Sequence, residues 1–215
     1  MKHITLRILC LSLSLLMLTA SLCLVSCSEK VDMAKIEAEI NSLASSDFEE
    51  TSETTEYVRI TVAGHGDIIL RLRADIAPKT VKNFQELVAD GLYNGLTFHR
   101  VIPGFMIQGG DPKGNGTGGT TPITGEMTNN GFVNDLSHIR GVLSMARRGG
   151  DYDSGSCQFF ICNADSTYLD KEYASFGYVV AGMDTVDSIS AVTTNSSGKP
   201  ATDVVMEKVC FVKKK

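Results

Sequence analysis

Apolar and polar residues alternate along the first regular part of the chain. In "YVRITV", Val58, Ile60 and Val62 lie on one side of an extended segment, and the residues between them lie on the other. The segment "IILRLR" alternates in the same way and follows the glycine-containing "AGHGD". Two alternating segments joined by a short glycine turn predict a β-hairpin that begins at Tyr57.

The period of the pattern then changes. In "APKTVKNFQELVADG", one helical face is formed by Val81, Phe84, Leu87 and Val88. Pro78 suits the first turn of this helix, and Gly91 suits its end. Short strand patterns follow at "TFHRVI", "FMIQG", "GVLSMA", "CQFFIC", "ASFGYVVAG" and "VVMEKVCFV", and a second helical pattern lies at "MDTVDSIS". Many short strands with two helices predict a mainly β protein, folded as a closed antiparallel barrel with helices at its open ends.

The N-terminal residues have a different character from the predicted barrel. A short basic segment, "MKHITLR", precedes the apolar "ILCLSLSLLMLTASLCLV", and the stretch ends in "LVSC" at Cys27. This order is typical of an export signal, and a retained membrane-spanning helix is the alternative. "LVSC" resembles the bacterial lipobox, which implies that residues 1–26 are a lipoprotein signal peptide and that Cys27 carries diacylglycerol. Two acyl chains are enough for stable anchoring, so we expect the protein at a cell membrane, on its extracellular or periplasmic face.

Residues 27–56 connect this segment to the predicted barrel. Met33, Ile36, Ile40 and Leu43 have the 3-4-3 spacing of one helical stripe, but the helix is too short to be stable alone. The following residues, 47–56, are acidic and rich in Ser and Thr. We therefore predict a lipidated cysteine and an acidic flexible tether over 27–56, followed by a folded domain over 57–215. A tether that recruits a partner protein is an alternative.

Charge and cysteine content limit the classes of partner. The chain has 215 residues and a net charge of −5, which argues against a nucleic-acid binder, whose surface is basic. Of its six cysteines, Cys157, Cys162 and Cys210 fall in the predicted barrel without a CxxC pair. Such a set indicates neither a disulfide framework nor a zinc site. We expect buried free thiols and no metal.

One arginine lies in an unusual context. In "FHRVIPGFMIQGG", Arg100 stands on an apolar run, and the only acidic residue among the ten that precede it is Asp90. Strand alternation places Arg100 on the face of Phe98 and Ile102, and it places His99 on the opposite face. After the Pro-Gly bend, Met106 and Gln108 share a face, as do Gln158 and Phe160. An apolar surface with a few polar groups and an unpaired arginine is typical of a ligand-binding groove.

These segments, taken together, resemble a known family. "FHRVIPGFMIQGGD", "GNGTGG", "GVLSMA", "SCQFFICNA" and "FGYVVAGMDTVDSI" follow one another between Tyr57 and Val212, as in cyclophilin-type peptidyl-prolyl cis-trans isomerases. The resemblance implies a closed eight-stranded antiparallel β-barrel capped by two α-helices. It also implies that Arg100 is the catalytic residue. The substrate-binding residues that it implies are His99, Phe105, Met106, Gln108, Ala146, Arg147, Gln158, Phe160, Tyr168, Leu169 and Tyr173.

Three of these positions depart from the family pattern. Tyr168 stands where Trp is common, Tyr173 stands where His is common, and Arg147 stands where Asn is common. The two tyrosines keep an aromatic wall, and we expect Arg147 to contact a peptide through its main chain only. His99 and His138 are interpreted as hydrogen-bonded structural histidines rather than acid–base catalysts.

The resemblance implies a monomeric isomerase that requires no cofactor, no metal and no nucleic acid. Its expected partners are proline-containing segments of exported proteins, whose slow X-Pro isomerisation can limit folding. The alternative is a chaperone or adaptor that binds proline-containing segments with little turnover. The presence of Arg100 together with Phe105, Met106, Gln108 and Phe160 favours the enzyme.

Overall fold

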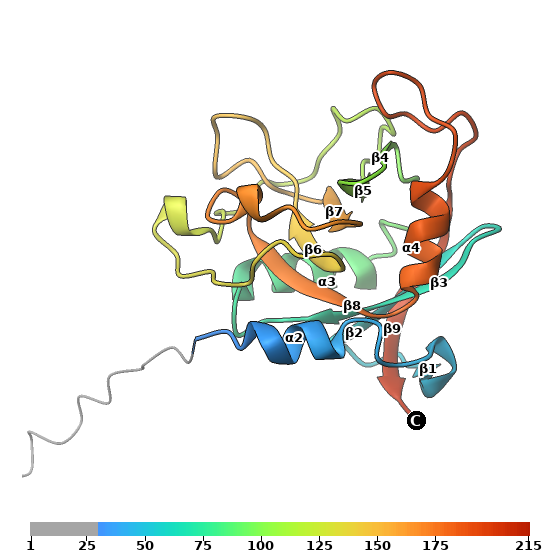
Figure 1. The fold of residues 1–215 in the computed structure, drawn as a ribbon, viewed down its shortest axis with the longest axis horizontal. Helices are drawn as coiled ribbons and strands as arrows, with labels where there is room; N and C mark the ends of the chain where they lie inside the picture. Colours follow the sequence, from blue (N-terminus) through green and yellow to red (C-terminus); the bar gives the residue numbers. More distant parts are fainter. Residues whose placement is uncertain (1–29) are drawn as a thin grey trace, which may run out of the picture. The chain divides into compact units, whose positions relative to one another are not determined.

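The computed structural model describes residues 30–215, and residues 31–215 form one folded unit. Nine strands form one antiparallel sheet in the order β1-β9-β2-β3-β8-β6-β7-β5-β4 (Figure 1). The strands are β1 (Phe48–Glu50), β2 (Tyr57–Val62), β3 (Gly66–Leu72), β4 (Arg100–Ile102), β5 (Met106–Gly109), β6 (Val142–Met145), β7 (Phe159–Cys162), β8 (Ser175–Ala181) and β9 (Met206–Lys214). The described α-helices are α2 (Met33–Glu39), α3 (Pro78–Ala89) and α4 (Met183–Ser190), and short 3-10 turns lie at Ser45–Asp47, Thr128–Asn130 and Thr167–Leu169.

The predicted hairpin and the predicted long helix are both confirmed. β2 pairs with β3 in register, and Val58, Ile60 and Val62 are buried while the residues between them are not. In α3, Phe84 is fully buried, and its ring centroid lies 5.5 Å from that of Phe159 on β7. The apolar stripe of α3 therefore packs into the main core beneath the sheet, as its spacing predicts.

The N-terminus of α3 is stabilised by a residue that the sequence pattern does not identify. Ala77 at the N-cap has no side-chain acceptor, and the buried carboxylate of Glu126 takes its place. Glu126 accepts hydrogen bonds from the backbone N–H of Lys79 (3.1 Å) and of Thr80 (2.8 Å). A carboxylate at a helix N-terminus satisfies free N–H groups and interacts favourably with the helix dipole.

The sheet differs in detail from the predicted closed eight-stranded barrel with two helices. It has a ninth strand and a third α-helix within residues 30–215 because β1 and α2 lie ahead of the predicted domain start. The ladder order begins at β1 and ends at β4, so barrel closure is not confirmed by strand pairing. Thr97 lies just before β4 and Val205 lies just before β9. These two residues form one isolated β-bridge, which is flanked by backbone hydrogen bonds.

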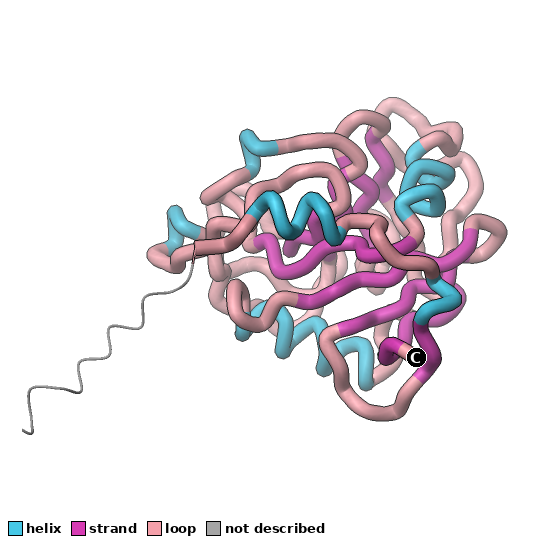
Figure 2. The backbone as a smooth tube through the Cα atoms, turned by 60° about the horizontal axis from the view of Figure 1, so that its bottom comes forward, coloured by secondary structure: helices cyan, strands magenta, loops and turns pink. Residues whose placement is uncertain are grey.

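The segment predicted as a solvated tether is packed against the sheet over much of its described part. Asp32 is the N-cap of helix α2, and its side chain accepts a hydrogen bond from Lys35 N. The helix crosses the outer face of the sheet (Figures 1 and 2). Ile36 and Phe48 are each only 2% exposed. They belong to a second apolar cluster, whose sheet residues include Ile69, Tyr178, Val180 and Val212. The prediction was wrong here because the outer face of the sheet is itself apolar and must be covered.

Specific polar contacts fix this N-terminal extension (residues 31–50) in register. Asn41 N and Leu43 N donate to the carbonyls of Val179 and Val180, and β1 pairs with β9. The Asn41 side chain also accepts a hydrogen bond from Met183 N (3.0 Å) at the start of α4. Asn41 has a φ of 54°, a left-handed conformation that asparagine tolerates better than most residues. The extension is therefore an integral part of the folded unit.

The predicted signal peptide and Cys27 lie outside the described residues. Within residues 30–215, no helix is both long enough and apolar enough to cross a membrane. The three remaining thiols are free, with Cys157 and Cys162 buried and Cys210 partly buried. Burial raises the pKa of the Cys162 thiol to about 12, so it stays protonated at neutral pH.

Candidate active site

A short hairpin positions Arg100. Strands β4 and β5 pair so that Arg100 lies opposite Gln108 and Ile102 lies opposite Met106, and the bend between them uses Gly104 at a φ of 72°. Strand β5 then pairs with β7, which places Phe160 opposite Gln108. Cross-strand partners point to the same face of a sheet, so these side chains converge on one side. This confirms the shared face that strand alternation predicts.

A cavity of about 130 Å³ lies over this face. Nine of the twelve predicted site residues line it: Arg100, Phe105, Met106, Gln108, Ala146, Arg147, Phe160, Leu169 and Tyr173. Its base is apolar, because Met106, Phe160 and Leu169 are buried and form a small cluster of their own. The ring of Tyr173 stands edge-on to that of Phe160, with centroids 5.7 Å apart and an interplanar angle of 84°. We call this space the proline cavity.

Arg100 has unused hydrogen-bond donors at the edge of the proline cavity. One of its guanidinium nitrogens donates to Gln108 Oε1 at 3.2 Å and lies 4.0 Å from the sulfur of Met106. Within residues 30–215 no carboxylate lies within ion-pair distance of Arg100. Because a guanidinium has five N–H donors, several remain available to a ligand.

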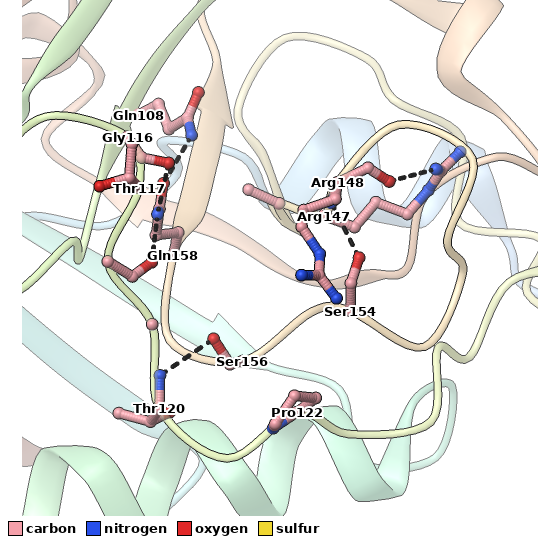
Figure 3. Close-up of a pocket in the computed structure, with 13 residues that line it drawn as sticks. Gln108, Gly116, Thr117, Thr120, Pro122, Arg147, Arg148, Ser154, Ser156 and Gln158 are labelled. Carbon is pink, nitrogen blue, oxygen red and sulfur yellow. Dashed lines mark hydrogen bonds between the residues drawn. The ribbon is translucent and has the colours of Figure 1, made fainter.

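A chain of amides orients Gln108 toward Arg100. Gln108 Nε2 donates to Gln158 Oε1 at 2.9 Å, and Gln158 Nε2 donates to the carbonyl of Gly118 at 2.7 Å (Figure 3). With its amide nitrogen engaged in this way, Gln108 presents its oxygen to the arginine. The two glutamines therefore hold the guanidinium in place without neutralising its charge.

A second, larger cavity of about 490 Å³ adjoins the proline cavity and shares Gln108, Ala146 and Arg147 with it. Gln158 and the residues 116–120 line its far side (Figure 3). Asp111, which is 1% exposed, fixes this loop by accepting backbone hydrogen bonds from Lys113 and Asn115. Burial alone would raise the pKa of Asp111, but these N–H donors outweigh it and lower the pKa. Sequence reasoning missed Asp111, although an Asp directly before a glycine-rich turn is a recognisable signal.

Three predicted site residues lie outside the proline cavity. Gln158 lines the second cavity, and Tyr168 is 68% exposed and packs on Phe105, with ring centroids 5.8 Å apart. His99 directly precedes β4, is buried and lines neither of these two cavities, so its role in the groove stays a prediction. The predicted alternation does not extend to this residue, because β4 begins only at Arg100 and Phe98, predicted on the face of Arg100, is buried in the main core. Burial lowers the pKa of His99, and the charge of Asp111 and a hydrogen bond with the backbone of Thr97 oppose that shift in part, so its structural role stays a prediction.

His138 is a hydrogen-bonded structural histidine, as predicted. Its Nδ1 lies 2.8 Å from Asp170 Oδ1, and its Nε2 lies 2.9 Å from the hydroxyl of Ser144. Its ring stacks on Phe160 with centroids 6.0 Å apart. Ser144 is fully buried, so this Ser-His-Asp arrangement is inaccessible to a substrate. It supports the base of the proline cavity from below.

Lowering the pH from about 7 to about 5 is expected to reduce the free energy of unfolding through His138 and His99. Burial lowers the pKa of both histidines from the ordinary 6.5, and for His138 Asp170 opposes that shift only in part. As the pH falls below 6.5, His138 and His99 become protonated in the unfolded chain before they do so in the folded protein. The free energy of unfolding therefore decreases as the pH is lowered. The pKa of Asp170 is lowered from 3.8, so this carboxylate stays ionised over the range.

Denaturant unfolding of the wild type and of His138→Gln across this pH range tests the expectation. The variant should show a smaller slope of unfolding free energy against pH. The slope that remains would come from the protonation of His99. An identical slope in both proteins would show that His138 takes up its proton equally easily in the folded and unfolded states.

Comparison with known proteins gives consistent matches. The family model for cyclophilin type peptidyl-prolyl cis-trans isomerases matches residues 57–210. The peptidyl-prolyl cis-trans isomerase ppi1 of Schizosaccharomyces pombe is 43% identical over 136 residues, covering 63% of this chain and 86% of that protein. The human peptidyl-prolyl cis-trans isomerase-like 1 is 44% identical over 140 residues, covering 65% of this chain and 82% of that protein. A crystal structure of a cyclophilin type isomerase from Cryptosporidium parvum, solved in the presence of the dipeptide Ala-Pro, has a TM-score of 0.67 at 32% identity. It covers 72% of this chain and 98% of that chain.

Proposed function

The chain belongs to the cyclophilin-type peptidyl-prolyl cis-trans isomerase family, and from that premise we propose that Arg100 accelerates the rotation of X-Pro bonds held in the proline cavity. The observation that carries the proposal is the position of Arg100. Its guanidinium lines an apolar cavity, has a glutamine as its hydrogen-bond partner, and has no carboxylate partner within residues 30–215.

The chemistry of the rotation explains why such an arginine is useful. The peptide C–N bond has partial double-bond character, which gives a rotation barrier of about 18–20 kcal/mol. When the bond is twisted by a quarter turn, conjugation is lost and the prolyl nitrogen carries a localised lone pair. A charged N–H donor placed beside that nitrogen stabilises the twisted state more than either planar isomer. Selective stabilisation of this kind lowers the barrier.

The remaining cavity residues hold the substrate while it rotates. We assign Phe105, Met106, Phe160 and Leu169 to the contact with the proline ring, since they form the apolar lining. One N–H of the Gln108 amide is engaged by Gln158, and we assign its second N–H to the carbonyl that precedes the proline. The Ala-Pro dipeptide present with the Cryptosporidium parvum isomerase supports proline-containing peptides as the substrate class. None of these steps requires a nucleophile or a general base.

Turnover distinguishes this proposal from a binding module. The purified protein should accelerate the cis-to-trans conversion of a short X-Pro peptide well above the uncatalysed rate, which has a time constant of tens to hundreds of seconds. A protein that binds the peptide without changing the rate would instead be the chaperone or adaptor considered as the alternative.

We further propose that the isomerase is anchored to a membrane through diacylglycerol on Cys27 and acts on exported proteins. The lipobox-like "LVSC" and the preceding apolar segment support this. Clients would then be chains that are folding near the membrane.

Substitution of the lipidation site tests the anchor. In a bacterial host, Cys27→Ser should abolish the incorporation of labelled fatty acid into the protein. Cys23→Ser is the matched control, because Leu22 before it does not fit the lipobox, and it should retain the label. Labelling that persists in Cys27→Ser, or is absent from the wild type, would contradict the proposed anchor.

A further inference from the structure

Arg147 lies between the two cavities, but its side chain is almost completely buried. It lines both cavities, and its side chain is only 7% exposed. Its guanidinium carbon lies 4.6 Å from the ring centroid of Tyr152 and 4.6 Å from that of Tyr173. Figure 3 shows the guanidinium pointing away from Gln108 and Gln158. Stacking between two aromatic rings is a favourable environment for a desolvated arginine.

Hydrogen bonds hold all three guanidinium nitrogens of Arg147. Nε donates to the carbonyl of Glu172 at 2.9 Å, and another nitrogen donates to the Glu172 carboxylate at 3.0 Å. The third donates to the carbonyl of Arg148 at 3.0 Å. The hydroxyl of Tyr152 donates to the same carboxylate at 3.1 Å. Three of its five N–H donors are used within the protein and its side chain is almost completely buried, so the Arg147 side chain is poorly placed to bind a ligand.

We propose that Arg147 is a positioning residue that fixes Tyr173 as the wall of the proline cavity. It connects the loop 147–155 to residues 172–173, and Tyr173 in turn packs edge-on against Phe160. A wall that is locked before the substrate arrives loses no side-chain freedom on binding, which strengthens binding. This proposal rests on the proposed function of the proline cavity, and it assigns a role to a side chain that we had expected to contribute only its main chain.

The role predicts a specific kinetic signature. Tyr173 lines the same cavity as the four residues assigned to the proline ring, so we assign it to one side of that ring, whose shape is nearly the same in the cis, trans and twisted forms. Loss of the wall should therefore weaken the binding of all three states equally. Uniform binding changes KM and leaves kcat unaltered, whereas loss of Arg100 would act on the twisted state.

Steady-state kinetics of Arg147→Ala on a short Ala-Pro peptide test the inference. We expect KM to rise about tenfold and kcat to change less than about twofold. Arg147→Lys should also raise KM, since lysine keeps the charge but has neither the planar stack nor the forked donors. Assays are run well below the unfolding midpoint of each variant, so that folded proteins are compared.

Arg59→Ala is the matched control for the loss of a buried arginine. The Arg59 side chain is 15% exposed, donates to the carbonyls of Ser45 and Phe48, and pairs with Asp67 at 3.4 Å, away from both cavities. The Arg59→Ala substitution should lower the unfolding midpoint and leave KM unchanged. An unchanged KM in Arg147→Ala, or a loss confined to kcat, or an equal rise in Arg59→Ala, would overturn the role of Arg147. A wild type without isomerase activity would instead refute the proposed function itself.

Discussion

Replacing Arg100 by alanine is expected to lower kcat/KM for an X-Pro peptide by about 10²- to 10³-fold, the usual effect of removing one donor that acts on the transition state. The loss should fall mainly on kcat. Phe105, Met106, Phe160 and Leu169 remain to bind the proline ring in the planar isomers, so the affinity of the ground state changes little. The measurement is a cis-to-trans isomerisation assay over a range of peptide concentrations.

Two further variants separate charge from geometry at this position. Arg100→Lys keeps a positive charge but cannot present two donors in a fixed plane, so we expect partial activity. Gln108→Ala removes the hydrogen-bond partner of Arg100, and its loss should be smaller than that of Arg100→Ala. The unfolding midpoint should be nearly unchanged in Arg100→Ala, because Arg100 makes no ion pair within the described residues. Full activity in Arg100→Ala would remove the arginine from the mechanism.

The active-site face was predictable because it depends on a short-range rule. Alternation along a strand assigns Arg100, Met106, Gln108 and Phe160 to one face, and the register of β4, β5 and β7 brings that face together. The same rule fails just before β4, because it predicts Phe98 on the face of Arg100 and the structure buries Phe98 in the main core. The position of Arg147 depends on a loop, so no periodic pattern indicated that its side chain folds back between two tyrosines.

The N-terminal extension was not predictable from its own residues. Its apolar positions are sparse and lie among acidic and Ser/Thr residues, which locally describe a solvated chain. The signal lay elsewhere, in "SFGYVVA" of β8, where all seven residues are buried. A strand of an antiparallel sheet that is apolar on both faces must be covered on both faces. Residues 31–50 provide that cover, because Ile36 and Phe48 belong to the same buried apolar cluster as Tyr178 and Val180.

A protein that lacks the residues before Glu56 is therefore expected to be strongly destabilised, although it retains the whole family-matched region 57–210. Burial of Ile36 and Phe48 contributes about 1.5–3 kcal/mol for each side chain. The truncation also removes the Asn41 cap of α4, the pairing of β1 with β9, and the ion pair of Glu39 with Arg71 at 2.7 Å. Domains are usually stable by only about 5–15 kcal/mol, so the truncated protein should be partly unfolded at growth temperature.

Single substitutions test the same packing without removing chain. Ile36→Ala should lower the free energy of unfolding by about 2–5 kcal/mol and Phe48→Ala by about 3–5 kcal/mol, measured by denaturant titration. Lys35→Ala, an exposed neighbour on the same helix, should change it by less than about 0.5 kcal/mol. Isomerase activity of the two core variants, assayed while they are still folded, should be close to wild type because the proline cavity belongs to a different apolar cluster. If Ile36→Ala is as stable as Lys35→Ala, the extension does not pack on the sheet in solution. Residues 31–50 would then be part of the flexible tether that their sequence predicts.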